Sequence, residues 1–222
     1  MFWSPASLIV DRFILKIKLN NTMKTILHLI SSPPQEASVS IKLGRAIVER
    51  LQQQFPGSRV NEVNLLEENI PHLGAPHLQS FFTPETELTS QDREAIAYSD
   101  RAISQLKYAD IIILGAPMYN FTIHSSLKAW IDHIARAGKT FRYTDHGPEG
   151  LVGDKKIYLA VASGGVYSGG PYEPYDFVVP YLKNILGFLG MTDVTVYRAE
   201  GLNIPVLQDH ALDKAIANIN LE

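Results

Sequence analysis

Cysteine is absent from this chain of 222 residues. Without a thiol, disulfides, thiolate zinc sites, iron–sulfur clusters and cysteine nucleophiles are all excluded. Any redox chemistry must therefore be carried out by a bound cofactor. The seven histidines form no HExxH or comparable ligand spacing, so we expect no metal site. A GxSxG nucleophile elbow is missing as well, which argues against hydrolase chemistry.

Familiar phosphate-binding signatures and a strong charge bias are also lacking. No complete GxxxxGK[ST] phosphate loop occurs, and the glycines between residues 164 and 170 do not have the spacing of the dinucleotide fingerprint. The net charge is only -3, which predicts no nucleic-acid partner. The length and the ordinary apolar content are typical of one globular domain with a full core.

The first 22 residues differ in character from the rest of the chain. An apolar stretch at residues 8–19 is interrupted by acidic and basic residues, and a membrane-spanning helix needs about 20 mostly apolar ones. The same charges argue against a signal peptide. We therefore expect a cytoplasmic protein that does not enter a membrane, with residues 1–22 as an extension outside a single domain, residues 23–222. The alternative is a short strand or amphipathic arm that packs on the domain or on a partner.

The most informative stretch is IIILGAPMYNF, residues 111–121. Its branched apolar run predicts a strand buried on both faces, as in the middle of a parallel sheet. Ligands of open α/β sheets bind outside the carboxyl ends of the strands. Aromatic and sulfur groups suit the faces of a flat heteroaromatic ring and an amide suits its edge, so a ring-binding platform is predicted at Met118, Tyr119, Asn120 and Phe121. A hydrophobic plug without a ligand is an equally good reading of these residues.

A second ligand loop is predicted after the first strand, residues 25–30. The loop is rich in Ser and Pro and ends at Ser38 and Ser40, just before apolar residues recur at helical spacing. Hydroxyls and free backbone N–H groups at the start of a helix form an anion site, which suits a phosphate. Simple capping by Ser38 or Ser40 needs no ligand and is the favoured interpretation of the loop taken alone, whereas its position after the first strand of an alternating α/β pattern favours a ligand.

Strands alternate with helices along the whole chain. Further strands are predicted at residues 59–65, 156–161 and 194–197, which makes five and indicates a doubly wound parallel sheet. In the flavodoxin-like order 2-1-3-4-5, the loops after strands one and three border the ligand crevice. Paired glycines after the fourth strand permit a close approach of the backbone to a ligand. An anion cradle beside a ring platform points to flavin mononucleotide (FMN).

Two longer segments have no clear helical or strand pattern. Residues 66–88 contain several prolines and are expected to be irregular, with Phe81 or Phe82 either lining a pocket or packing beneath the loop. Residues 138–153 are also expected to be loop.

Three local patterns concern polar groups. Thr89 and Asp92 have the spacing of a capping box at the start of a helix. His28 lies within the first strand and is expected in the core. Asp132 and His133 suggest acid–base chemistry, but a charged pair on a solvated helix face is the favoured interpretation.

Several segments resemble those of the FMN-dependent NADH azoreductases, a family that also reduces quinones. The resemblance is carried by PMYNF (117–121), LKAWID (127–132), RAGKTFRYT (136–144), GPEGL (147–151), the glycine pair 164–165 and LGFLG (186–190). It extends over nearly everything from Met23 to the end of the chain, and PMYNF and RAGKTFRYT are highly specific segments.

The resemblance implies a homodimeric flavodoxin-like enzyme with one FMN per subunit near the dimer interface. NADH or NADPH would be the reductant, quinones and azo compounds the acceptors, and the order of events ping-pong. A flavodoxin-type electron carrier is the alternative, although carriers usually need a strongly acidic docking face, which a net charge of -3 does not suggest. A sheet protein that has lost its cofactor is a further alternative.

The resemblance also assigns residues. The phosphate loop falls on Ser32, Ser38, Val39 and Ser40, and the isoalloxazine contacts fall on Met118, Tyr119, Asn120 and Phe121. Further cofactor positions are Ala162, Ser163, Gly164 and Gly165. The family has an arginine where this chain has Ser163, so a charge contact from that position is not expected here. Tyr143 and Phe188 match residues that line the substrate pocket.

Overall fold

A computed structural model of the protein describes residues 23–33 and 37–221. The predicted extension, residues 1–22, lies outside the described residues, and the predicted domain boundary at residue 23 stays a prediction. Within the described residues, no helix is both long and apolar enough to cross a membrane.

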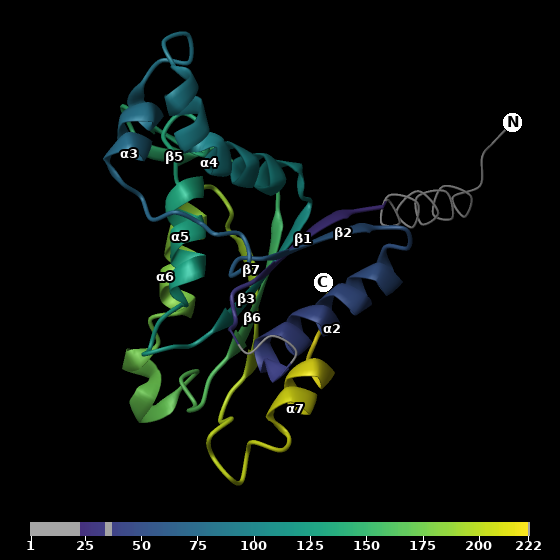
Figure 1. Cartoon of the computed structure of the whole chain (residues 1–222). Coiled ribbons are helices and arrows are strands. Elements are labelled where there is room, and N and C mark those ends of the chain that lie inside the picture. Colours follow the sequence, from purple (N-terminus) through teal and green to yellow (C-terminus); the bar gives the residue numbers. More distant parts are fainter. Residues whose placement is uncertain (1–22, 34–36, 222) are drawn as a thin grey trace, which may run out of the picture.

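Five parallel strands form the central sheet, in the order β2-β1-β3-β6-β7 (Figure 1). Because β4 and β5 form a separate ribbon, β6 and β7 are the fourth and fifth strands of this sheet, and the predicted flavodoxin-like order is confirmed. The strands are β1 (Thr25–Ile30), β2 (Arg59–Asn64), β3 (Ile111–Pro117), β6 (Lys156–Ala162) and β7 (Asp193–Ala199).

Helices cover both faces of the sheet (Figure 1). One face packs against α4 (Ser90–Tyr108), α5 (Ser125–Ile134) and α6 (Val179–Phe188), and the other against α2 (Val39–Gln54) and α7 (Ala211–Ala217). The capping box predicted at the start of α4 is confirmed, since Thr89 Oγ1 accepts the Asp92 N–H and the Asp92 carboxylate accepts the Thr89 N–H.

Strand β3 contributes to both cores. Ile112 and Leu114 pack in the core under α4, α5 and α6, whereas Ile111 and Ile113 pack in the core under α2. All seven residues of the strand are buried. Alternate side chains of a strand point to opposite faces, so a strand covered on both faces must be apolar at every position.

The segment predicted to be irregular, residues 66–88, contains a helix instead, α3 (Ala75–Phe82). Pro76 lies in its first turn, where a missing N–H costs nothing, and the Gly74 N–H donates to His77 Nδ1 at 3.0 Å. Phe81 packs beneath the segment, with the Arg136 guanidinium 4.6 Å from its ring centre, while Phe82 is exposed. The prediction failed because α3 is short and its N-terminus is capped by a histidine side chain, a combination without a strong sequence pattern.

His133 is a second correction, because it is buried rather than on a solvated face. Its Nε2 lies 2.8 Å from the Pro71 carbonyl oxygen, and its ring meets those of His77 and Tyr98 edge-on. Burial holds the pKa of His133 below its ordinary value. The residue therefore joins α5 to the segment before α3, and no acid–base role follows from it. His28 is confirmed as a core residue.

Residues 138–153, predicted to be loop, contain the antiparallel ribbon of β4 (Phe141–Thr144) and β5 (Gly147–Gly150). Arg142 and Glu149 face each other across this ribbon, with Nε 2.8 Å from a carboxylate oxygen. The ribbon packs directly on the end of α6, because a Cβ added to Gly150 would lie 2.1 Å from the backbone nitrogen of Gly190. Only glycine allows that approach.

We expect Gly150→Ala to lower the free energy of unfolding by about 3 kcal/mol, because the new methyl group meets backbone atoms that cannot turn aside. Gly153→Ala is the matched control, since its added Cβ would find only one neighbour, at 3.9 Å. Urea unfolding monitored by circular dichroism measures both variants. Equal stability of the two variants would contradict the close approach.

Candidate functional site

The loops after β1, β3 and β6 meet at the carboxyl edge of the sheet, where α2 begins (Figure 1). The Met118 N–H donates to the Ala162 carbonyl oxygen at 2.8 Å, which joins the second loop to the third. A Cβ added to Gly115 would lie 4.0 Å from the Ser40 carbonyl oxygen, so the first turn of α2 sits beside the end of β3. Three segments far apart in the sequence therefore form one surface.

The start of α2 has the features of an anion cradle. Ser38 is the N-cap residue, yet its side chain makes no capping hydrogen bond, and its Oγ instead lies 3.0 Å from Ser40 Oγ. Simple side-chain capping is therefore not what holds this end of the helix. The first N–H groups of a helix lack intrahelical acceptors, and Ser38 and Ser40 are both buried beside them. This combination suits a phosphate.

The other predicted phosphate positions lie close by. Ser31, just before Ser32, donates its hydroxyl to the Gly115 carbonyl oxygen at 2.6 Å, which ties the first loop to β3. Ser32 itself is buried, and Val39 opens the helix.

A strained turn follows β3. The backbone groups of Tyr119 and Thr122 exchange hydrogen bonds of 2.9 and 3.0 Å, and the two residues between them have positive φ. Asn120, at φ 49°, often adopts this conformation, but Phe121, at φ 69°, rarely does. Backbone strain of this kind is concentrated at ligand sites. The Phe121 ring is held at the surface with 48% of its area exposed.

A cavity of about 600 Å³ lies between this turn and the glycine pair after β6. Its lining includes five of the predicted flavin contacts, which are Met118, Asn120, Phe121, Gly164 and Gly165. The remaining wall was not predicted and consists of Tyr167, Tyr172, Asn203 and Ile204. A cavity of this size, with aromatic walls and a few amides, is typical of small-molecule sites.

The unpredicted wall comes from two places. Tyr167 and Tyr172 belong to the long segment between β6 and α6, and Asn203 follows β7. Backbone hydrogen bonds of 2.9 to 3.1 Å fasten residues 201–203 to residues 163–165. A Cβ added to Gly164 would lie 2.5 Å from the Asn203 amide, so the glycine is needed for this contact. The position of Asn203 after the fifth strand of a parallel sheet was the available signal, because all such loops share one edge.

Tyr119 faces a different cavity from Met118. This second cavity, of about 500 Å³, shares Asn120 with the first and is otherwise lined by the start of α5 and by Tyr181. His124 caps α5 there by accepting the Ser126 N–H, and burial lowers the pKa of His124. Asn120 therefore lines both cavities.

Position 163 has no charge to offer a ligand. The Ser163 hydroxyl is buried and donates to the Gly165 carbonyl oxygen at 2.9 Å. This bond braces the glycine turn from within. Ala162, also buried, contributes through its carbonyl oxygen, which accepts from Met118.

Tyr143 and Phe188 do not lie near these loops in the same chain. Tyr143 is on the β4–β5 ribbon and Phe188 at the end of α6, and both rings meet Phe141, with centroids 5.6 and 4.6 Å away. Gly190, two residues beyond Phe188, lines a cavity with Lys156 and Asp193 at the amino ends of β6 and β7. The two predicted substrate residues are therefore close to each other but at the opposite edge of the sheet from Met118.

The doubly wound sheet carries the anion cradle and the aromatic cavity at the same edge, an arrangement that defines an α/β protein built to hold a planar ring that carries a phosphate. The chain belongs to the flavodoxin-like fold family, whose model matches residues 24–221. The family resemblance inferred from sequence is confirmed by curated relatives and solved structures.

Two relatives carry the name FMN-dependent NADH:quinone oxidoreductase. The FMN-dependent NADH:quinone oxidoreductase 6 of Burkholderia lata is 46% identical to this chain over 86% of this chain and 95% of its own length. The protein of Herminiimonas arsenicoxydans is 42% identical over 88% of this chain and 94% of its own length.

Two solved structures from Bacillus anthracis also match. An azoreductase of strain Sterne has a TM-score of 0.81 at 35% identity, covering 88% of this chain and 96% of that one. An FMN-dependent NADH-azoreductase of strain Ames Ancestor, in complex with FMN, has a TM-score of 0.78 at 26% identity, covering 88% and 97%.

The residues present here fit FMN. The buried Ser38 and Ser40 hydroxyls and the uncapped first turn of α2 suit its phosphate. The cavity beside Met118 and Phe121 suits a flat ring, because its lining combines aromatic side chains, amides and the glycine pair 164–165, where the backbone itself can approach a ligand.

Asn120→Ala is expected to weaken FMN binding about tenfold, because it removes an amide at the cavity edge and strains a backbone with positive φ. Asn120→Gly separates the two causes, since glycine relieves the strain but also lacks the amide. FMN titrations followed by quenching of flavin fluorescence measure both. Wild-type affinity in both variants would reject the amide contact, and wild-type affinity in Asn120→Gly alone would assign the loss to strain.

Proposed function

We propose that this protein is an FMN-dependent oxidoreductase that transfers two electrons from NADH or NADPH to quinones and azo compounds. The observation that carries the proposal is that a cavity of about 600 Å³ and the uncapped start of α2 lie at the same edge of the sheet, in segments that resemble the azoreductases. The names of the relatives and neighbours support the choice of reductant and acceptors.

The chain's own residues position the reactants. The first turn of α2 would anchor the FMN phosphate, and the turn after β3 would hold the isoalloxazine ring against the glycine pair. Bound FMN supplies the reversible two-electron chemistry. The protein contributes orientation, stacking and hydrogen bonds, and no side chain needs to act as an essential general acid.

The shape of the site supports a ping-pong order. Residues after β3, β6 and β7 line the cavity together, and the Phe121 ring among them is partly exposed. A planar donor and a planar acceptor would both have to stack on the same exposed ring face. They would therefore bind one after the other rather than together.

A homodimer would explain the placement of Tyr143 and Phe188. Tyr143 is 75% exposed on the β4–β5 ribbon, so its ring is accessible to a second copy of the chain. Since neither residue reaches the cavity of its own chain, we propose that each completes the substrate pocket of a second copy. Such an arrangement would be a symmetric dimer with two equivalent sites.

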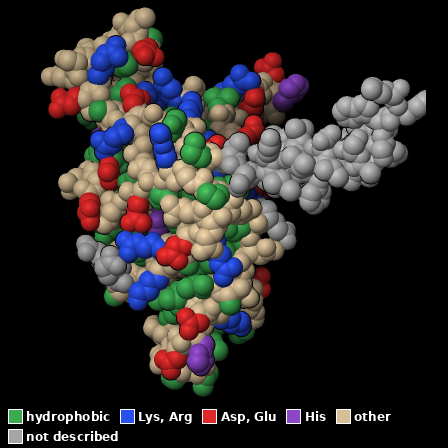
Figure 2. All heavy atoms as spheres, turned by 90° about the vertical axis from the view of Figure 1, so that its right-hand side faces the viewer, with side chains coloured by type: hydrophobic (Ala, Val, Ile, Leu, Met, Phe, Trp, Pro, Cys, Tyr) green, Lys and Arg blue, Asp and Glu red, His purple; other side chains and the backbone are tan. Residues whose placement is uncertain are grey.

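Steady-state kinetics with NADH and a quinone or an azo dye test the function. We expect parallel double-reciprocal lines, which are the signature of a ping-pong order. When the protein is mixed with NADH alone, before any acceptor is added, the absorbance of the oxidised flavin should fall rapidly. A protein that binds FMN but is not reduced by NADH would be an electron carrier, and one that stays colourless with FMN would overturn the proposal. The face in Figure 2, where acidic and basic side chains are interspersed, offers a carrier no strongly acidic docking surface.

Mixed dimers test the contribution of Tyr143. Tyr143→Ala and Asn120→Ala subunits are each expected to be impaired alone. After refolding together, about a quarter of the sites would combine an intact cavity with an intact partner tyrosine if a C2 dimer shares its sites. Activity of the mixture should therefore exceed the average of the two variants. Activity equal to that average, with dimers present by light scattering, would show that Tyr143 does not contribute to the pocket of the partner subunit.

A further inference from the structure

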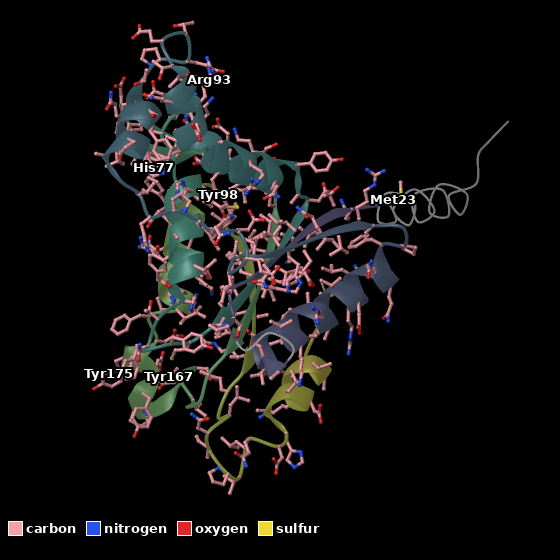
Figure 3. The ribbon with its side chains drawn as sticks, viewed as in Figure 1. Met23, His77, Arg93, Tyr98, Tyr167 and Tyr175 are labelled. Carbon is pink, nitrogen blue, oxygen red and sulfur yellow. The ribbon has the colours of Figure 1, made fainter. Side chains whose placement is uncertain are left out.

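The segment between β6 and α6, residues 163–178, forms one wall of the flavin cavity although it contains little regular structure. Its one regular element is the 3-10 helix η2 (Gly170–Tyr175). Tyr167 and Tyr172 line the cavity from this segment, and the Phe121 ring lies 6.3 Å from Tyr167 and 5.7 Å from Tyr175. Figure 3 shows Tyr167 and Tyr175 close together at the end of the molecule that carries η2. A wall of this kind needs anchors outside itself to hold its rings in place.

Two carboxylates hold the segment: Glu200 lies outside it and binds its beginning, whereas Asp176 belongs to it and binds the start of α6. Glu200, just after β7, accepts the Tyr167 N–H at 2.8 Å and the Ser168 hydroxyl at 2.5 Å. Asp176 accepts the N–H groups of Val178 and Val179 at 2.9 and 3.0 Å, which caps α6. The segment is thus fixed at its beginning by Glu200 and at its end by Asp176.

Arg198 on β7 joins the two anchors. One guanidinium nitrogen lies 2.5 Å from Asp176 Oδ2 and the other 3.3 Å from Glu200 Oε1. The three side chains are largely buried, with 18% of Arg198, 5% of Asp176 and 11% of Glu200 exposed. Removal of the arginine would leave two neighbouring buried carboxylates without their positive charge, and this costs far more than loss of a surface ion pair.

We propose that Arg198 is a positioning residue for the flavin site: by clamping both ends of residues 167–176 to β7, it holds Tyr167 and Tyr172 against the cavity and so sets the affinity for planar acceptors. Arg198 does not itself line that cavity, so it acts through the segment. The inference rests on the proposed function for its catalytic readout, but the state of the segment can be measured without cofactor or substrate.

Arg198→Met tests the clamp, and Lys156→Met is the matched control. Lys156 pairs with Asp193 at 2.9 Å and joins the same two strands, but at the opposite edge of the sheet. In the protein without FMN, we expect amide hydrogen exchange of residues 164–176 to accelerate about tenfold in Arg198→Met and to stay unchanged in Lys156→Met. With FMN, the KM for a quinone should rise about tenfold while kcat changes less than about twofold, because the clamp shapes the wall and not the reacting atoms.

Two further variants keep the test decisive. Arg198→Met combined with Glu200→Gln removes the carboxylate repulsion but keeps an acceptor for the Tyr167 N–H, so exchange and KM should recover part of the way to wild type. Arg198→Lys keeps the positive charge but lacks the planar guanidinium that contacts both carboxylates. Its exchange rates and its KM should lie between those of wild type and Arg198→Met. It replaces Arg198→Met as the test if that variant does not fold.

Wild-type exchange and wild-type KM in Arg198→Met, or equal effects in Lys156→Met, would overturn the clamp. A loss of kcat with unchanged exchange and unchanged KM would overturn it as well, because that pattern places the effect outside the segment. An inactive wild-type protein would reject the proposed function and leave the exchange result to decide the clamp on its own.

Discussion

The placement of β3 between β1 and β6 is the constraint on which the rest of the structure depends. Its backbone is hydrogen-bonded in parallel on both sides, and every one of its side chains is buried. Parallel pairing sends the carboxyl ends of all three strands to the same edge, so their loops must meet there. The phosphate cradle and much of the ring cavity are consequences of that alignment, because the cradle follows β1 and the cavity is lined by residues that follow β3 and β6, together with Asn203 and Ile204 after β7.

The turn after β3 is strained, and hydrogen bonds on both sides hold it in place. Asn120 and Phe121 have left-handed backbone conformations, and the Phe121 ring lines the cavity. Such strain persists only where the surroundings enforce it. The enforcing contacts are visible on both sides. The Tyr119–Thr122 hydrogen bonds close the turn, and the Met118 N–H is held by Ala162 of the neighbouring strand. On the far wall, a buried guanidinium on β7 plays the corresponding part for a segment that has little regular structure of its own.

Much of this arrangement was predictable from the sequence. A continuous apolar run identifies β3 without ambiguity, and strand-and-helix alternation then determines which loops share an edge. Predictions failed where the signal was tertiary. The short helix α3 and the β4–β5 ribbon depend on packing partners, Gly150 against Gly190 above all, that no local pattern reveals. The cavity wall around Tyr167 was missed because its shape is set by Arg198 and Glu200, which lie more than thirty residues later.

The central claim is that one pocket at the carboxyl edge of the sheet binds FMN, with its phosphate at α2 and its ring beside Phe121. The most direct measurement is the change in backbone amide chemical shifts when FMN is added to the isotope-labelled protein. The largest shifts are expected in three separate segments, residues 38–41, 118–121 and 163–167. Shifts concentrated elsewhere, or in only one of these segments, would contradict the account.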